Sequence, residues 1–380
     1  MMMKTTRLNR IWVALLALVL CTGAVRAAQW SAEYEKKVGD EAAAQAEKYY
    51  KVMDDPERTK HLNEMAAILG RASDRPEVIY TVKLLESDEV NAFSLPGGYI
   101  YVTKGLLDDA QSDDEVAGVI AHEIAHNCGY DGLNRAEKDK KLFMGSLAAA
   151  LTAVLLGGGT EEVNAVLQAG EFTRMGVLSH YSMDLERRCD RRAVRYLCDS
   201  KTYNPVGLLT FMERLAARER REPRQELGIY ADHPNSNVRV SLIISYLQDA
   251  DVEINRRAVT KWDPPQVADV EVDGAQVPTL SLWGVNLLQT THPAGAASAT
   301  ERLTTAAEAL REQLAAGLET YEVDVTAGDG AAQVLLRGKT WLTVYPEDVR
   351  ADGAQPLDVA RQAASGLSTA FAKERLGRWY

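Results

Sequence analysis

His122, Glu123 and His126 form a His-Glu-x-x-His pattern inside an apolar stretch of the chain. A helix has about 3.6 residues per turn, so histidines at positions i and i+4 lie on the same face, one turn apart. Two imidazoles in this arrangement can bind one zinc ion, and a glutamate beside the first can reach a water molecule on that ion. The pattern therefore predicts a helix with a zinc-dependent hydrolytic site in which Glu123 is the general base. The alternative is a surface helix that carries two histidines without a function.

Glu186 and Asp190 are the carboxylates that can complete such a site. A catalytic zinc ion usually has three protein ligands and one position open to water. Glu186 and Asp190 are also at i and i+4, in a segment expected to be helical, so both lie on one helix face. Glu186 can supply the third ligand, and Asp190 can accept a hydrogen bond from a ligand imidazole. Their spacing alone is equally compatible with a solvated helix face that carries ion pairs.

Four segments in a fixed order place these residues in a wider pattern. They are Asn-Ala-Phe-x-x-Pro-Gly-Gly at 91–98, an acidic and apolar lead into His-Glu-x-x-His at 114–126, Glu-x-x-x-Asp at 186–190, and His-Pro-x-x-x-x-Arg at 233–239. With these motifs the chain resembles the gluzincin-type zinc metallopeptidases that include the CAAX prenyl endopeptidases, HtpX, BepA and LoiP. The resemblance implies one Zn2+ per chain, bound by His122, His126 and Glu186, with Asp190 beside the ligands.

The resemblance also implies a substrate site beside the Pro-Gly-Gly motif. In relatives, an extended peptide lies along the edge strand that carries this motif. The corresponding residues of this chain are Asn91, Ala92, Phe93, Gly97 and Gly98. An open strand edge offers unpaired N–H and C=O groups to a peptide backbone, which gives affinity without side-chain specificity. The alternative for the Pro-Gly-Gly motif is an ordinary hairpin turn.

His233 and Arg239 are candidates for catalysis through the late motif. Either side chain could stabilise the oxyanion of the tetrahedral intermediate or orient the substrate carbonyl. The resemblance also allows His233 to occupy the open zinc position as an inhibitory fourth ligand. Asp232 precedes this histidine, where relatives more often have a small hydroxyl residue. A histidine beside a proline can also cap a helix, so the role of His233 stays open.

Residues 1–27 have the pattern of a secretory signal peptide, with a basic start, an apolar segment at 11–20 and small residues that suit cleavage before Ala28. A helix over 11–20 would be about 15 Å long, against ~30 Å for the hydrocarbon layer, so a permanent membrane anchor is not expected. We therefore expect a periplasmic protein. Cys21 raises the alternative of a lipoprotein, but Leu20 stands where a lipobox has Gly, Ala or Ser.

The remaining apolar and cysteine residues leave two further questions open. The apolar stretch 142–156 is short and interrupted, which favours a buried or membrane-surface helix and allows peripheral membrane contact. Cys128, Cys189 and Cys198 remain after cleavage. Cys128 and Cys189 flank the zinc motifs, so they could form a disulfide in an oxidising compartment or remain buried and unpaired.

Length and charge limit the remaining possibilities. The chain has 380 residues, which suggests two domains. The formal net charge of −11 argues against a nucleic-acid partner, because phosphate binding requires a basic surface. We expect an α+β fold with a mainly helical zinc-metallopeptidase domain at 28–258, which contains a small edge-exposed sheet. A smaller α+β domain follows at 266–380, after a proline-containing linker.

The C-terminal domain has a pattern that occurs twice. Strand-like residues at 277–288 precede a helix expected at 300–316, and strand-like residues at 334–344 precede a helix expected at 356–375. The pattern suggests two strand-strand-helix repeats. Such a domain could serve recognition, docking or dimerisation.

These features predict a periplasmic zinc-dependent endopeptidase that hydrolyses peptide bonds of misfolded or misassembled envelope proteins. A zinc-activated water would be the nucleophile, and Glu123 its general base. The partners would be polypeptide substrates, in the main unfolded envelope proteins. The alternative is a chaperone or assembly factor for outer-membrane proteins with little proteolysis. A purely structural zinc site is a third reading, but such a site has no use for a base at Glu123.

Overall fold

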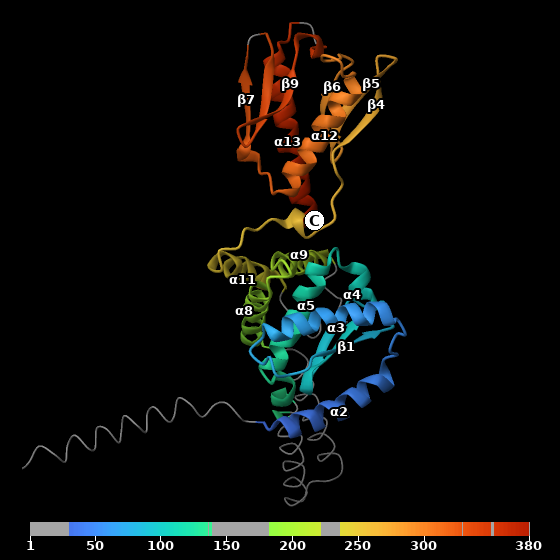
Figure 1. The fold of residues 1–380 in the computed structure, drawn as a ribbon, viewed down its shortest axis with the longest axis vertical. Coiled ribbons are helices and arrows are strands. Elements are labelled where there is room, and N and C mark those ends of the chain that lie inside the picture. The colour runs from blue at the N-terminus through green and yellow to red at the C-terminus, as the bar shows by residue number, and fades with distance from the viewer. Residues whose placement is uncertain are drawn as a thin grey trace, which may run out of the picture.

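The computed structural model describes residues 30–135, 137–138, 182–221, 236–328, 330–350 and 353–379. The expected signal peptide, the apolar stretch 142–156 and His233 lie outside these residues. The fold is α+β and mainly helical, which confirms the predicted fold class, and its two parts follow one another along the long axis (Figure 1). Within the described ranges, no helix has both the length and the apolar character that a bilayer crossing requires.

The N-terminal part consists of a small sheet surrounded by helices. The sheet has the order β1-β3-β2, in which β1 (Thr81–Leu85) is parallel and β2 (Ala92–Leu95) antiparallel to the central strand β3 (Tyr99–Thr103). The helices are α2 (Ala32–Tyr49), α3 (Pro56–Arg71), α4 (Lys104–Asp109), α5 (Asp113–Cys128), α8 (Met183–Ser200), α9 (Val206–Arg221) and α11 (Ser236–Asp249). The edge strand β2 packs beside α5, so the free edge of the sheet lies near the helix that carries the His-Glu-x-x-His motif.

Helix α5 lies at the centre of this part. Ser112 caps it by accepting a hydrogen bond from the N–H of Glu115, and the acidic first turn suits the positive end of the helix dipole. Gly118 allows a close crossing with α9, because a Cβ atom there would lie 2.7 Å from the Cα of Leu208. The helix is buried from Glu115 to Cys128. Polar side chains in this stretch must therefore find partners inside the protein.

The C-terminal part contains two three-stranded antiparallel sheets around two helices (Figure 1). The elements are β4 (Gln266–Val272), β5 (Ala275–Leu282), β6 (Val285–Gln289), α12 (Ala299–Ala315), β7 (Val323–Ala327), β8 (Ala332–Leu336), β9 (Lys339–Val344) and α13 (Pro356–Trp379). Helix α13 packs against strands of both sheets, and so does α12. The two sheets and two helices therefore share a single apolar core.

The two units of the C-terminal part are closely alike. Each unit is strand-strand-strand-helix, whereas the sequence suggested strand-strand-helix, so one strand per unit was missed. The last hairpins turn at Trp283-Gly284 and Arg337-Gly338, and all four residues have positive φ. Each hairpin also has a register shift at the same distance before its turn, at Leu280/Ser281 and Val334/Leu335. The shared irregularities support an internal duplication.

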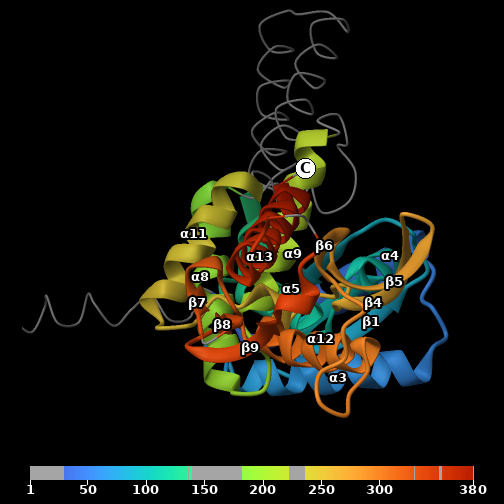
Figure 2. The same ribbon diagram turned by 90° about the horizontal axis from the view of Figure 1, so that it is seen from above.

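A short 3-10 helix, η2 (Arg256–Ala258), joins the two parts. Arg256 pairs with Glu213 of α9 at 2.7 Å, and Arg257 pairs with Glu374 of α13 at 2.8 Å. Figure 2, viewed along the long axis, shows α13 above α9, and these two helices are in contact. Each half of the molecule is thus attached to η2 by a different arginine.

Candidate metal centre

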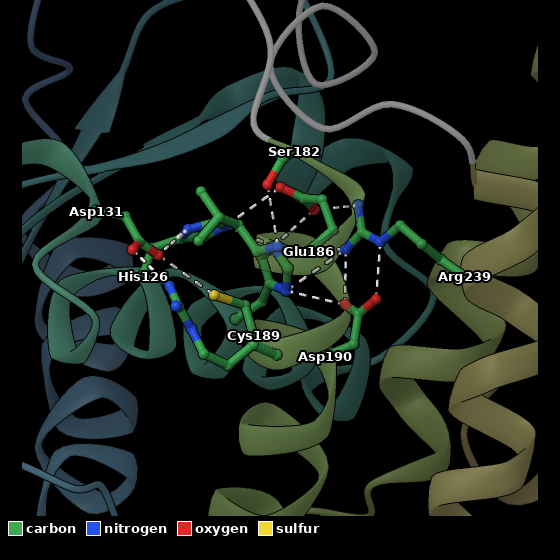
Figure 3. A network of polar contacts seen from close by, with 10 residues as sticks. His126, Asp131, Ser182, Glu186, Cys189, Asp190 and Arg239 are labelled. Atoms are coloured by element: carbon green, nitrogen blue, oxygen red, sulfur yellow. Dashed lines mark hydrogen bonds and ion pairs between the residues drawn. The ribbon is translucent and has the colours of Figure 1, made fainter. Parts of the chain in front are cut away.

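His122 and His126 of α5 meet Glu186 of α8 in the interior of the N-terminal part (Figure 3). The Nε2 atoms of the two imidazoles are 3.1 Å apart. The Glu186 carboxylate lies 3.4 Å from Nε2 of His122 and 3.5 Å from Nε2 of His126. All three side chains are buried, and Glu186 is 0% exposed. The structure thus brings together the three residues that the sequence predicted as metal ligands.

The separations between these donor atoms fit a single zinc ion. With bonds of about 2.0–2.1 Å, the ligand atoms of a tetrahedral site are ~3.3 Å apart, and the three separations here are 3.1, 3.4 and 3.5 Å. Two imidazole nitrogens and a carboxylate oxygen are also ligands that zinc prefers. Geometry and donor chemistry therefore both suit the metal.

Asp190 and Arg239 lie beside this donor set. Asp190 Oδ1 is 3.0 Å from Nδ1 of His122, as expected for a carboxylate that orients a ligand imidazole. Arg239 of α11 donates to Asp190 from Nε at 2.8 Å and from Nη2 at 2.7 Å, and its Nη1 is 2.8 Å from Glu186. The guanidinium is 2% exposed. The expectation that Arg239 stabilises an oxyanion does not fit these contacts, because all three nitrogens face carboxylates of the site.

Asp131 is a site residue that the sequence analysis missed. Its Oδ2 is 3.0 Å from Nδ1 of His126, and its Oδ1 accepts a hydrogen bond from Nη2 of Arg188 at 2.5 Å. It follows α5, where the backbone of Tyr130 has a φ of 55°. The available signal was an aspartate five positions after the second histidine of the motif, directly after a glycine-containing turn.

The pKa shifts show that the site favours charged side chains. Burial raises the pKa of Asp190, but Arg239 outweighs burial and lowers this pKa below its usual value. Burial lowers the pKa of His126, but its neighbours, Cys189 and Asp131 foremost, outweigh burial and raise this pKa well above its usual value. The carboxylates of Asp131 and Glu186 beside His126 create a negative field. Such a field also suits a divalent cation.

Glu123 and His233 complete the list of predicted catalytic residues. Glu123 lies on α5 next to His122 and is 2% exposed, so the proposed base is in the interior beside the predicted ligands. His233 precedes α11, which supplies Arg239, but it lies outside the described residues. Its role therefore stays a prediction from the sequence.

The predicted substrate residues of β2 and its approach face inward. Ala92 is 0% exposed and Asn91 is 7% exposed. The backbone of Asn91 is bound to Thr103 on both its N–H and C=O sides. Phe93 stacks on Tyr101 with ring centroids 5.0 Å apart. Asn91 and Ala92 are buried in the sheet, whereas Phe93 is half-buried, so the main chain at the edge of β2 and the ring of Phe93 are left to contact a peptide.

Gly97 and Gly98 lie in a covered turn, η1 (Pro96–Gly98), which packs against α2. The N–H of Gly97 donates to Glu35 at 3.2 Å. A Cβ on Gly98 would lie 2.5 Å from the carbonyl oxygen of Ile79. Both glycines have positive φ, which accounts for their place in this turn, and their contact with a substrate stays a prediction.

The cysteines within the described ranges, Cys128, Cys189 and Cys198, are all free thiols. Cys128 lies 3.3 Å from the hydroxyl of Tyr80, and Cys189 lies 3.7 Å from Oδ2 of Asp131. The alternative of a disulfide between Cys128 and Cys189 is therefore wrong for this structure. Burial raises the pKa of Cys189 above its usual value, so the thiol form is favoured there.

Comparison with protein families gives one match: the model described as peptidase family M48 matches residues 54–247, just over half of the chain. The matched residues include every described side chain of the candidate metal centre.

Comparison with curated proteins gives relatives that are proteases by name, two of them metalloproteases. Metalloprotease LoiP of Escherichia coli (strain K12) is 32% identical over 187 residues, which cover 49% of this chain and 69% of that protein. The beta-barrel assembly-enhancing protease of the same strain is 24% identical over 209 residues, 54% of this chain and 42% of that protein. The mitochondrial metalloendopeptidase OMA1 of Schizosaccharomyces pombe is 24% identical over 195 residues, 51% of this chain and 55% of that protein. The chain thus spans about half the length of the curated relatives it matches.

Proposed function

Because the chain belongs to peptidase family M48, we propose that it is a zinc-dependent endopeptidase. The observation that carries this proposal is the buried triad of donor atoms from His122, His126 and Glu186, with separations of 3.1 to 3.5 Å. We assign these three residues as the ligands of one Zn2+. The fourth position of a tetrahedral site would remain open for water or substrate.

The mechanism follows from the side chains around this position. When bound, zinc supplies a Lewis acid that lowers the pKa of a water molecule to about 7. Glu123 would accept a proton from the attacking water as the water oxygen adds to the scissile carbonyl carbon, and would then pass this proton to the leaving amine. No side chain forms a covalent bond to the substrate in this scheme. His233 remains the candidate from the sequence for the oxyanion or for the open zinc position.

We propose that Asp190 and Arg239 are positioning residues and not groups that touch the substrate. Asp190 accepts from Nδ1 of His122, which fixes Nε2 as the nitrogen that faces the metal. Arg239 bridges Asp190 and Glu186, so one guanidinium holds the ligand carboxylate and the orienting carboxylate in a fixed relation. Its planar fork of donors suits this task.

The proposed substrates are polypeptides in extended conformation. The edge strand β2 packs against α5, and an edge strand can pair with a peptide backbone whatever its side chains. One backbone acceptor of this strand, the carbonyl of Leu95, already accepts from Asn127 at 2.6 Å. Pairing would therefore use the residues that precede Leu95.

We propose a periplasmic location and envelope proteins as natural substrates. The support is the signal-peptide pattern at 1–27 and the similarity to the beta-barrel assembly-enhancing protease of Escherichia coli. That relative also favours a second candidate function, namely an assembly factor that binds clients and cleaves them rarely.

Zinc analysis and casein hydrolysis test these proposals together. We expect wild type to contain one zinc ion per chain and to cleave casein, Glu123→Gln to keep the zinc and lose cleavage, and Glu186→Ala to lose both. Glu64→Gln, an exposed change on α3, is the matched control and should behave as wild type. A Glu123→Gln protein that still promotes folding of an outer-membrane protein would favour the assembly factor. Full cleavage by Glu123→Gln would contradict the mechanism.

A further inference from the structure

The carboxylate of Asp131 receives three donors in the interior of the N-terminal part. These are Nδ1 of His126 at 3.0 Å, Nη2 of Arg188 at 2.5 Å and the thiol of Cys189 at 3.7 Å. Asp131 is 3% exposed. A carboxylate with this degree of burial is costly unless paired, so its place beside His126 is fixed by the fold.

The turn after α5 directs Asp131 back toward the helix. Helix α5 ends at Cys128, and a left-handed residue, Tyr130, reverses the chain so that Asp131 reaches a histidine five residues earlier. A positive φ is unfavourable for a residue with an aromatic side chain and is found where other contacts enforce it. Gly129 leaves space for the Asp131–Arg188 pair, since a Cβ atom at this position would lie 2.9 Å from both Asp131 oxygens and from Nη2 of Arg188.

A clamp from the first described helix holds this turn. Arg75 makes two hydrogen bonds with Glu35 of α2, at 2.9 and 2.7 Å, and both side chains are largely buried. The guanidinium of Arg75 also lies over the ring of Tyr130, 4.3 Å from its centroid. Its Nη1 further donates to the carbonyl of Asn127, at 3.4 Å, in the last turn of α5. The left-handed residue Tyr130 is therefore held by Arg75, which Glu35 of α2 anchors.

The two imidazoles of the site have matching surroundings, and Figure 3 shows their two carboxylate partners, Asp131 and Asp190, on opposite sides of Glu186. On one side, Nδ1 of His122 faces Asp190, which Arg239 holds. On the other side, Nδ1 of His126 faces Asp131, which Arg188 holds. In both cases an arginine-bound carboxylate leaves Nε2 directed at the third ligand. Arrangements of this kind raise the basicity of a ligand imidazole and fix its orientation.

We propose that Asp131 is the positioning residue of His126, and that the Glu35–Arg75–Tyr130 clamp supports zinc binding through it. This inference rests on the proposed zinc site. In this proposal Asp131 acts on zinc binding through the imidazole of His126. The clamp makes α2, which supplies no ligand, a part of the metal centre.

The test is the zinc dissociation constant, measured by competition with a chromogenic chelator. Asp131→Asn keeps the shape of the side chain and removes its charge, and we expect the dissociation constant to rise about 10–100-fold. Arg75→Met should raise it by a smaller factor, on the order of threefold to tenfold, and should add little in the Asp131→Asn background. Asp113→Asn, an exposed change on the same helix, is the matched control and should leave zinc affinity unchanged.

An NMR readout separates positioning from a general loss of stability. In zinc-loaded wild type, the Nδ1 proton of His126 should appear far downfield because it is donated to a carboxylate. It should move upfield in Asp131→Asn and stay in place in Asp113→Asn. A folded Asp131→Asn protein whose zinc dissociation constant is within twofold of wild type overturns the proposal. If that variant does not fold, Arg188→Met decides by the same criterion, since it changes a half-exposed side chain and leaves the Asp131 carboxylate beside His126.

Casein cleavage by the same preparations separates this proposal from the proposed function. A wild-type protein that binds zinc but cleaves nothing contradicts the endopeptidase, and the dissociation constants still decide the role of Asp131. A wild-type protein that cleaves casein, with Asp131→Asn binding zinc equally well, contradicts the role of Asp131 alone.

Discussion

The core of the N-terminal part contains charged groups at its centre, whereas the core of the C-terminal part is formed almost entirely by aliphatic side chains. Around α5 the buried set includes Glu115, Asp131, Glu186, Asp190 and Arg239. Among residues 266–379 as described, the comparable group is one ion pair, formed by Asp348 with Arg302 at 3.0 Å.

The contrast indicates that the N-terminal core serves the metal site, whereas the C-terminal core serves only the stability of the fold. Buried charges are expensive, and replacing them with apolar side chains often stabilises a protein. The N-terminal part retains them in a connected network around three donor atoms. The C-terminal part repeats one unit of three strands and a helix, and its ion pair between Arg302 and Asp348 joins α12 to the segment after β9. Substitutions should therefore affect metal and activity in one part and only stability in the other.

The largest effect is expected for Glu123→Gln. Loss of the general base should lower the turnover number for casein by a factor of about 10^2–10^4, with zinc content and melting temperature near wild type. The reason is that the amide cannot accept a proton from water. If the turnover number of Glu123→Gln were within tenfold of that of wild type, the proposed catalytic role of the N-terminal core would be contradicted.

Arg239→Met should have the second-largest effect. It removes a member of the buried charge network and leaves Glu123, the proposed base, unchanged. It leaves the carboxylates of Asp190 and Glu186 buried without their cation, so we expect a stability loss of about 3–5 kcal/mol in the metal-free protein. Chemical unfolding with chelator measures this loss, and zinc should offset part of it. Arg191→Met, an exposed neighbour on α8, serves as control. Equal stability of the two variants would show that the buried network is not a structural requirement.

Asp348→Asn probes the ion pair of the C-terminal part. We expect a loss of about 2–3 kcal/mol, with zinc binding and casein turnover unchanged. Burial raises the pKa of Asp348, but Arg302 and Thr290 outweigh it and lower this pKa below its usual value. A lowered folded-state pKa means that the stabilisation is present above the unfolded pKa of about 3.9 and is lost as pH falls through the folded value. The difference in unfolding free energy between wild type and variant should therefore narrow below about pH 4. A variant that also loses zinc would contradict the separation of the two cores.

Ser298→Ala should give the smallest effect. Ser298 and Glu301 form a capping box at the start of α12. Removing the hydroxyl should cost about 1 kcal/mol in chemical unfolding, since one backbone N–H loses its partner. Ser365→Ala, on an exposed face of α13, should change stability by less than about 0.5 kcal/mol. Any change in turnover from either serine would indicate coupling between the two parts.

The sequence was sufficient for the residues whose spacing determines their position. His122 and His126 are one helical turn apart, so their proximity follows from α5 alone, and Glu186 and Asp190 follow in the same way from α8. The expected helices at 300–316 and 356–375 correspond to α12 and α13, which are amphipathic and begin near Ser298 and Pro356.

The remaining features depend on tertiary contacts. Asp131 reaches His126 only because Tyr130 adopts a left-handed conformation, which no local pattern predicts. The contacts of Arg239 could not be foreseen, since nothing in its motif indicates that both its carboxylate partners would come from α8. Strands β4 and β7 were missed because they lie at sheet edges and are exposed along most of their length. Such strands lack the alternation of apolar and polar residues that marks a half-buried strand.

The adjacent arginines of η2 have a mechanical consequence. Arg256 is anchored to α9, and Arg257 is anchored to the far end of the chain through Glu374 and to the carbonyl of Leu318. If the C-terminal part rotated about η2, either the Arg256–Glu213 pair or the Arg257–Glu374 pair would have to break. The two adjacent arginines therefore restrict rotation of the two parts against each other. We expect the two parts to tumble together in solution as one elongated particle.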